Sequence, residues 1–216
     1  LEQVRVLDLS PYLPTQYCSF LLASLGAEVI LVERPGGREV AFPGLFELVN
    51  CGKKSIQLDL KSELPREVFY RLAQRADVIL EGFRPGVASR LKIGYEEVKG
   101  LNPRIIYCSI SGFGQNGPYR DKPGHDVNYL ALSGYFAIPG QIGVRPSRPG
   151  IPLVDLCAGV LAAVSVLAAL LARERTGEGQ YIDLAMLDAI TAWTSLRAGS
   201  YLVKKEPVTE EHVLAT

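Results

Sequence analysis

Short, almost continuously apolar segments alternate with segments of helical spacing through the first half of the chain, and this alternation limits the available folds. The apolar segments, each of strand length, are residues 4–9, 27–33, 54–60, 77–81 and 104–109. Helical signals lie between them at residues 16–25, 63–76, 87–91 and 95–101. Buried strands joined by helices predict an α/β fold, with a parallel sheet and flanking helices on both faces.

The second half of the chain is expected to be helical, over residues 126–136, 155–173 and 181–201. Residues 154–172 are almost wholly apolar and about long enough to span a bilayer. Small residues dominate this run, an aspartate lies in it, and the polar sequence RERTGEGQ follows it, so a buried core helix is the better interpretation. In that polar turn, Gly177 and Gly179 are expected at positive φ.

Composition argues against several classes of partner. The 216 residues contain 23 Lys+Arg and 23 Asp+Glu, so net charge provides no reason to expect nucleic acid or an anionic membrane. Four scattered cysteines and two distant histidines predict reduced thiols and no metal site. Residues 1–10 begin with a strand pattern rather than a secretory leader. A cytoplasmic location is therefore expected, with an organelle left open because both ends look trimmed.

Basic residues follow several expected strands, where parallel sheets bind their ligands. These residues are Arg34, Arg38, Lys61, Arg84 and Arg90. Several cations at one sheet edge suit a ligand with several phosphates, although each alone is also explained as solvated surface charge. The outline is Rossmann-like, but neither GxGxxG nor GxxxxGK[ST] is present, so the pattern does not indicate NAD binding.

His125 and Asp155 are the candidate acid and base. His125 follows Pro123 and Gly124 at the start of an expected helix, and Asp155 stands at the start of the long apolar helix. As structural residues they would be a loop histidine and an N-cap. If they face one pocket, an imidazole and a carboxylate can transfer protons on opposite sides of one carbon. An enolate formed there needs hydrogen-bond donors at its oxygen.

An ordered set of segments resembles the CaiB/BaiF family, also called class III CoA-transferases, which includes the α-methylacyl-CoA racemases. These segments are RVLDLS, LLASLGAEVILVERPGG, NCGKKSIQLDLK, ADVILEGFRPGV, NPRIIYCSISGFGQNGPY, GHDVNYLALSG, DLCAG and LLARERTGEGQYIDLAMLDA. The resemblance implies a large CoA-binding domain (residues 1–203), a linker (204–216) toward a small domain absent from this sequence, and an interlocked homodimer.

The resemblance also implies that coenzyme A binds as part of the acyl-CoA substrate, with no permanently bound cofactor. The CoA-binding positions implied by the family are Arg34, Lys61, Gly82, Phe83, Arg84, Arg90 and Lys122.

The segment GHDVNYLALSG favours the racemase branch of the family. There His125 and Asp155 would be catalytic, and Asp126 would offer its backbone N–H to the thioester oxygen. The reaction would invert the α-carbon of a 2-methylacyl-CoA through an enolate. The alternative is a CoA-transferase in which Asp155 forms an acyl anhydride, because LCAG is closer to transferases and Cys51 replaces a common arginine. A CoA-ester binding fragment without activity is the third possibility.

Overall fold

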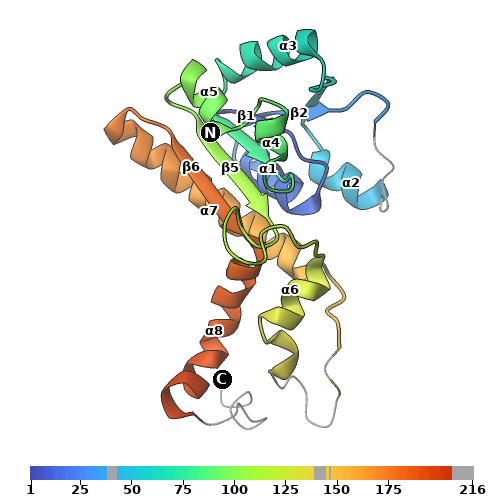
Figure 1. Ribbon diagram of the computed structural model, residues 1–216, viewed down its shortest axis with the longest axis vertical. Coiled ribbons are helices and arrows are strands. Elements are labelled where there is room, and N and C mark those ends of the chain that lie inside the picture. The colour runs from blue at the N-terminus through green and yellow to red at the C-terminus, as the bar shows by residue number, and fades with distance from the viewer. Residues whose placement is uncertain (38–42, 139–144, 146, 206–216) are drawn as a thin grey trace.

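The computed structural model describes residues 1–37, 43–138, 145 and 147–205 (Figure 1). Its centre is a six-stranded sheet of order β3-β2-β1-β4-β5-β6, in which all neighbouring strands are parallel. The strands are β1 (Arg5–Asp8), β2 (Glu28–Glu33), β3 (Lys54–Gln57), β4 (Val78–Glu81), β5 (Ile106–Ser111) and β6 (Gln180–Ala185). The α/β prediction with a parallel sheet is confirmed.

Helices connect every strand to the next. They are α1 (Leu13–Ser24), α2 (Pro43–Asn50), α3 (Glu63–Ala73), α4 (Val87–Arg90), α5 (Tyr95–Leu101), α6 (Asp126–Leu132), α7 (Leu153–Thr176) and α8 (Met186–Lys204), with a 3-10 turn at Tyr135–Ala137. Helix α2 was not predicted from the sequence. The predicted linker, residues 204–216, lies outside the described residues from residue 206 onward.

The sheet separates two apolar cores because side chains alternate between faces along each strand. Val6, Val78 and Ile106 belong to the cluster that includes residues of α1 and α7. Their neighbours Leu7 and Ile79 belong to the second cluster, which includes residues of α3 and α5. With apolar side chains buried on both faces, the strands read as continuous apolar runs.

The strand order reverses between β1 and β4. The chain winds outward from β1 through β2 to β3, and then returns to pair β4 on the other side of β1. Loops after β1 and β4 therefore leave the sheet in opposite directions. They open a crevice at the carboxyl ends of these strands, where open α/β sheets bind ligands.

Helix α7 is the long apolar helix of the core. It packs most extensively on α1, and it also contacts α6, α8, β5 and β6. Among the described helices it is long and apolar enough to cross a membrane by length and composition, but half of its apolar window is buried inside the molecule. The structure places it as the core helix that the sequence predicted.

Two predictions beyond α7 were wrong. A helix over residues 181–201 was expected, but Gln180–Ala185 forms strand β6, paired with β5, and α8 begins only at Met186. The six residues of this edge strand are too few for periodicity to distinguish them from the start of a helix. Gly177 has φ 77°, as expected, but Gly179 does not have positive φ. Gly179 is needed for space, because an added Cβ would lie 1.9 Å from the Ile105 carbonyl oxygen.

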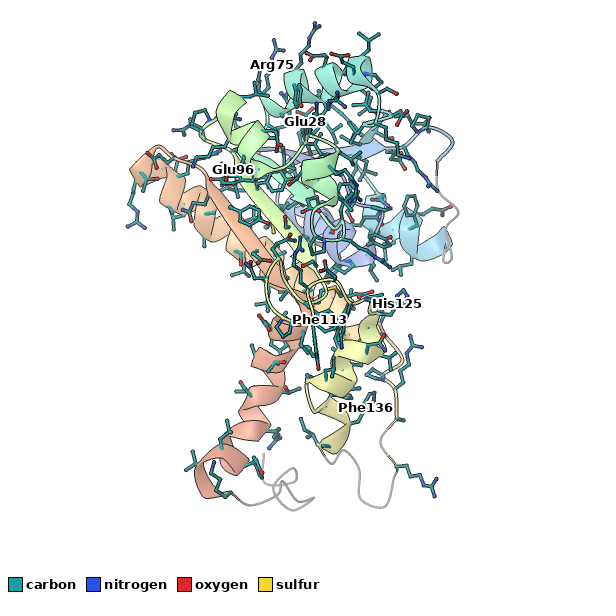
Figure 2. All side chains as sticks on the ribbon, viewed as in Figure 1. Glu28, Arg75, Glu96, Phe113, His125 and Phe136 are labelled. Atoms are coloured by element: carbon teal, nitrogen blue, oxygen red, sulfur yellow. The ribbon has the colours of Figure 1, made fainter. Side chains whose placement is uncertain are left out.

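Helices α6 and α8 extend away from the sheet as two arms in Figure 1, beyond the lower end of β5. The arms touch each other, and the Thr194 hydroxyl donates to the Ser133 carbonyl oxygen at 3.1 Å. The start of α6 lies where this arm meets the body of the molecule, and His125 marks this place in Figure 2.

Candidate active site

A cavity of about 370 Å³ opens at the carboxyl ends of β1, β2, β3 and β4, in the crevice beside the strand reversal. Its floor and walls include Asp8 and Leu9 at the end of β1 and Phe83 after β4. Arg34 and Lys61 contribute the basic groups predicted to bind phosphate. Apolar walls with a few cations suit a ligand that combines a planar apolar ring with phosphates.

The predicted CoA-binding residues do not all gather in this cavity. Arg34, Lys61 and Phe83 line it, whereas Arg84 lines a second hollow of about 320 Å³. Arg90, at the end of α4, lines neither of the two hollows. Arg38 lies outside the described residues.

Gly82 and Lys122 have other surroundings. An added Cβ on Gly82 would lie 2.6 Å from the Ser10 hydroxyl and 2.7 Å from the Thr15 hydroxyl, so the turn after β4 needs glycine to pass this close to β1. The Lys122 ammonium lies 4.2 Å from the centre of the Tyr119 ring, a cation–π contact away from the cavity. A role for Lys122 in CoA binding stays a prediction.

A buried pair of opposite charges, Lys53 and Asp8, lies at the cavity, which Asp8 lines. Lys53 lies 3.9 Å from the Asp8 carboxylate, and both side chains are fully buried. Lys53 also donates to the Gln16 carbonyl oxygen, the Ser19 hydroxyl and the Asn50 side chain. Burial raises the pKa of Asp8, and it lowers the pKa of Lys53 to about 8. The hydrogen bonds around the pair offset part of this desolvation.

Glu81, at the end of β4, lines the second hollow. Its carboxylate accepts a hydrogen bond from the Ser109 hydroxyl and one of 2.7 Å from the Phe83 N–H. Burial raises its pKa to about 7, although these hydrogen bonds oppose the shift. The same turn presents Phe83 to the cavity and Arg84 to the second hollow. Glu81 therefore fixes the backbone of the turn that contains Phe83 and Arg84, two of the predicted CoA-binding residues.

The candidate acid and base lie at the starts of two helices that are joined to each other. His125 is exposed and precedes α6, and its backbone N–H donates to Asn128 Oδ1 at 2.9 Å. Asp155 is half-buried in the first turn of α7. The Asp126 carboxylate oxygen Oδ2 accepts from the N–H groups of Val154 (2.6 Å) and Asp155 (3.2 Å). Asp126 thus brings both helix starts together.

This geometry corrects the interpretation of Asp155 as an N-cap. The helix begins at Leu153, and Pro152 occupies the N-cap position without a side-chain hydrogen bond. Asp155 lies inside the first turn, and its carboxylate does not cap the helix. The capping oxygen comes instead from Asp126 on another element, which is not visible from sequence position.

The electrostatic surroundings of Asp155 favour its protonated form. Burial first, and the negative charge of Asp126 second, together raise the pKa of Asp155 to about 7. The charge of Asp155 in turn adds to burial in raising the pKa of Tyr129, a buried residue of α6. A carboxyl that holds a proton near neutral pH can act as an acid in one direction and as a base in the other.

Sequence reasoning missed Glu81 and Tyr129. The Tyr129 phenol fills the space above two glycines, since an added Cβ on Gly112 or Gly124 would lie 2.1 or 2.7 Å from its oxygen. Phe113 packs edge-on against it at 5.2 Å between ring centres. A tyrosine preceded by glycine-rich turns carries no local signal of such a fit. Glu81, by contrast, was detectable as an acidic residue ending an apolar strand.

Some expected interactions are not formed in the structure. Among the described residues, no hydrogen bond or ion pair joins the His125 imidazole to the Asp155 carboxyl. Across residues 1–37, 43–138, 145 and 147–205, no three His, Cys, Asp or Glu side chains gather as metal ligands would. The pairing of His125 with Asp155 on a substrate stays a prediction.

The fold and the cavity define a class: an α/β protein with an open parallel sheet and a ligand cavity at its switch point. Comparison with known proteins narrows this class. The model of CoA-transferase family III matches residues 1–214, and the chain belongs to this family, as the resemblance predicted.

Relatives in this family carry both racemase and transferase names. The succinyl-CoA:mesaconate CoA-transferase of Haloarcula hispanica is 42% identical over 209 residues, covering 89% of this chain and 53% of the relative. The alpha-methylacyl-CoA racemase of Homo sapiens is 42% identical over 197 residues, covering 90% of this chain and 50% of the relative.

A solved structure confirms the fold. The crystal structure of a CAIB/BAIF family protein from Brucella suis matches with a TM-score of 0.90 at 33% identity, covering 95% of this chain and 58% of that one. The chain therefore spans about half the length of the curated relatives that it matches.

Proposed function

We propose that this protein is an acyl-CoA racemase that inverts the α-carbon of a 2-methylacyl-CoA thioester. The CoA part of the substrate would occupy the cavity at the carboxyl ends of β1–β4, with its phosphates near Arg34 and Lys61. Coenzyme A would arrive with the substrate and leave with the product. The cavity, its cations and the membership in CoA-transferase family III support this placement.

One group of the acid–base pair would remove the α-proton and the other would return a proton to the opposite face. The observation that carries this proposal is Asp155, whose pKa burial raises to about 7, held on a helix start that Asp126 joins to the His125 helix start. The enolate oxygen would accept from the Asp126 backbone N–H. This N–H is the first of α6, where no acceptor exists within the helix.

Exchange of the α-proton tests the proposal. The protein is incubated in deuterated water with 2-methylacyl-CoA, and deuterium at the α-carbon is followed by mass spectrometry. We expect exchange in the wild type and a loss of about 100-fold or more in His125→Ala and in Asp155→Asn. Arg175→Ala, at the far end of α7, is the matched control and should retain exchange. Full exchange in His125→Ala would contradict the racemase assignment.

A CoA-transferase is the second candidate, and the names of the relatives favour it. Besides the Haloarcula protein, relatives named as acetyl-CoA:oxalate and succinyl-CoA:glutarate CoA-transferases match this chain. In that reaction the Asp155 carboxylate would attack the thioester, release the CoA thiolate and form a mixed anhydride. Mass spectrometry of Asp155 peptides after incubation with an acyl-CoA would detect the adduct. An adduct without α-proton exchange would establish the transferase.

A CoA-ester binding protein without either chemistry is the third candidate. Calorimetric titration with CoA distinguishes it, because binding would be present while exchange and adduct are both missing.

A further inference from the structure

The side chain of Asp126 has a role separate from that of its backbone. Asp126 is only 7% exposed, and it stands at the first residue of α6. Its Oδ2 accepts hydrogen bonds from two N–H groups of the first turn of α7, those of Val154 and Asp155. Twenty-seven residues or more separate these partners in sequence, so the contact is wholly tertiary.

The first turn of α7 depends on this carboxylate. The first N–H groups of any helix have no acceptor within the helix. Pro152, at the N-cap position, supplies no side-chain acceptor. Asp126 therefore does for α7 what an N-cap side chain does locally, and it does so for the residue that carries the candidate acid.

The second oxygen of Asp126 leaves its charge uncompensated. Oδ1 is buried and has no hydrogen-bond partner among the described residues. No lysine or arginine of the described chain forms an ion pair with this carboxylate. The carboxylate thus places a negative charge beside Asp155, and its hydrogen bonds come from the backbone N–H groups of Val154 and Asp155.

We propose that the Asp126 carboxylate is a positioning residue, which clamps the start of α7 against α6 and places a second negative charge beside the Asp155 carboxyl. This inference deepens the proposed function and rests on it, because the proton on Asp155 matters only if Asp155 acts as an acid.

The surroundings of Asp155 support this assignment. The raised pKa of Asp155 has two causes, burial first and the charge of Asp126 second. Tyr129 is the other titratable group of α6 near Asp155. Helix α1, the main partner of α7, contains no Asp, Glu, Lys, Arg or His, and its titratable groups are Tyr17 and Cys18. Titratable groups on the other elements packed against α7 are Tyr107 and Cys108 on β5, Tyr181 and Asp183 on β6, and Asp188, Arg197 and Tyr201 on α8.

Two substitutions separate the effect of the hydrogen bonds to the α7 amides from the effect of the negative charge of Asp126. Asp126→Asn keeps an oxygen that can accept from the α7 amides but removes the negative charge, whereas Asp126→Ala removes both. Both variants keep the backbone N–H of residue 126. The titration of Asp155 is followed by carbon-13 NMR of aspartate carboxyls, and its signal is assigned by its absence in Asp155→Asn.

We expect the Asp155 carboxyl to titrate about one unit lower in Asp126→Asn than in the wild type, because a neighbouring like charge has been removed. CoA binding should remain within about twofold, which shows that the cavity is intact. In Asp126→Ala the same downward shift should accompany a fall in thermal midpoint of about 3 °C, since the helix start has lost its cap. An unshifted Asp155 titration in Asp126→Asn would overturn the proposal.

The pH dependence of the reaction rate adds a test, because a purely structural role of Asp126 would leave it unchanged. In the direction in which Asp155 is the acid, the rate falls as pH rises through its pKa. This alkaline limb should move about one unit lower in Asp126→Asn. If the Asp155 titration moves down in Asp126→Asn as expected but the wild type shows no α-proton exchange, the racemase proposal is refuted and the clamp is supported. A shifted NMR titration with an unmoved alkaline limb would overturn the role of the Asp155 proton in the reaction.

Discussion

Buried carboxyls are the residues whose behaviour depends most on their surroundings. Glu81 and Asp155 both have pKa values raised to about 7, in each case mainly by burial. The Phe83 N–H and the Ser109 hydroxyl donate hydrogen bonds that stabilise part of the charge of Glu81, whereas the negative charge of Asp126 adds to burial at Asp155. Groups held in this way near neutral pH are typical of functional sites rather than of packing alone.

Replacing Glu81 by glutamine should flatten the dependence of stability on pH. The pKa of Glu81 is about 7 in the folded state, against an ordinary value of 4.5 for an exposed glutamate, so the folded protein binds more protons than the unfolded chain between these pH values. Stability should then fall as pH rises from 4.5 to 7, by at most about 3 kcal/mol. Glu81→Gln, measured by urea unfolding at pH 5 to 8, should lose this part of the slope.

Glu96→Gln is the matched control for this prediction. Glu96 is an exposed glutamate on α5 that lines the same second hollow, and it is labelled in Figure 2. Its substitution should leave the slope as in the wild type. A slope in Glu81→Gln equal to that of the wild type would mean that Glu81 is already ionised at low pH.

At the scale of elements, α7 organises the fold by packing directly on α1. Gly159 allows this close approach, because an added Cβ would lie 2.8 Å from the Pro14 carbonyl oxygen and 2.9 Å from the Tyr17 ring. The tight contact aligns the start of α7 with the rest of the core. The location of Asp155 therefore depends on a glycine one turn further along the helix.

Gly159→Val should separate α1 from α7 and destabilise the protein by about 1–3 kcal/mol through overpacking. Chemical unfolding would measure this change. Gly100→Ala in α5 is the control, since its added methyl group meets nothing within 4 Å, and it should stabilise the protein by about 0.5–1 kcal/mol. Equal effects of the two substitutions would contradict the packing argument.

The other end of α7 is attached to the sheet by a salt bridge. The Arg173 guanidinium donates to the Asp77 carboxylate at 2.9 Å and to the Arg104 carbonyl oxygen at 3.2 Å. Asp77, just before β4, also accepts from the backbone N–H of Arg5. One guanidinium thus connects α7 with the starts of β4 and β1.

Arg173→Met should cost about 2 kcal/mol of unfolding free energy, because Asp77 would lose its buried cation while remaining partly in solvent. Arg175→Met, an exposed position in the same turn, should change the unfolding free energy by less than about 0.5 kcal/mol. Equilibrium unfolding in urea distinguishes the two. A neutral Arg173→Met would show that the salt bridge contributes no net stability.

At the scale of the whole molecule, binding and stability are linked through the cavity at the switch point. If coenzyme A binds the folded protein alone, a concentration of about 100 times its Kd should add about 2.7 kcal/mol to the unfolding free energy. Arg34→Ala should weaken this binding roughly tenfold by removing a phosphate partner. Calorimetry and unfolding in the presence of CoA would measure both effects.

Arg75→Ala is the matched control for Arg34→Ala. Arg75 lies beyond the end of α3, near the starts of β1, β2 and β3, and Figure 2 shows it near the top of the molecule, well above His125. It should leave CoA affinity unchanged. Equal losses in both variants would indicate a general effect of net charge instead of a phosphate site.

The sequence by itself determined the class of fold, most strands and helices, and the family. Continuous apolar strands and helical spacing are local properties, so β1, β2, β4, α3 and α5 were predictable within a few residues. An ordered set of motifs was equally readable, and the family comparison confirms it. Arg34 and Lys61 were predictable as cations at the carboxyl edge because parallel strands share that edge.

Only the tertiary structure decided how the site is assembled. The cap of α7 comes from Asp126 on α6, and the separation of Arg84 from Arg34 depends on the turn that Glu81 holds. Strand β6 forms because it pairs with the free edge of β5, and no local pattern near residue 180 predicts this pairing. Burial and long-range hydrogen bonds depend on groups distant in sequence, and these set the charge states on which the proposed reaction depends.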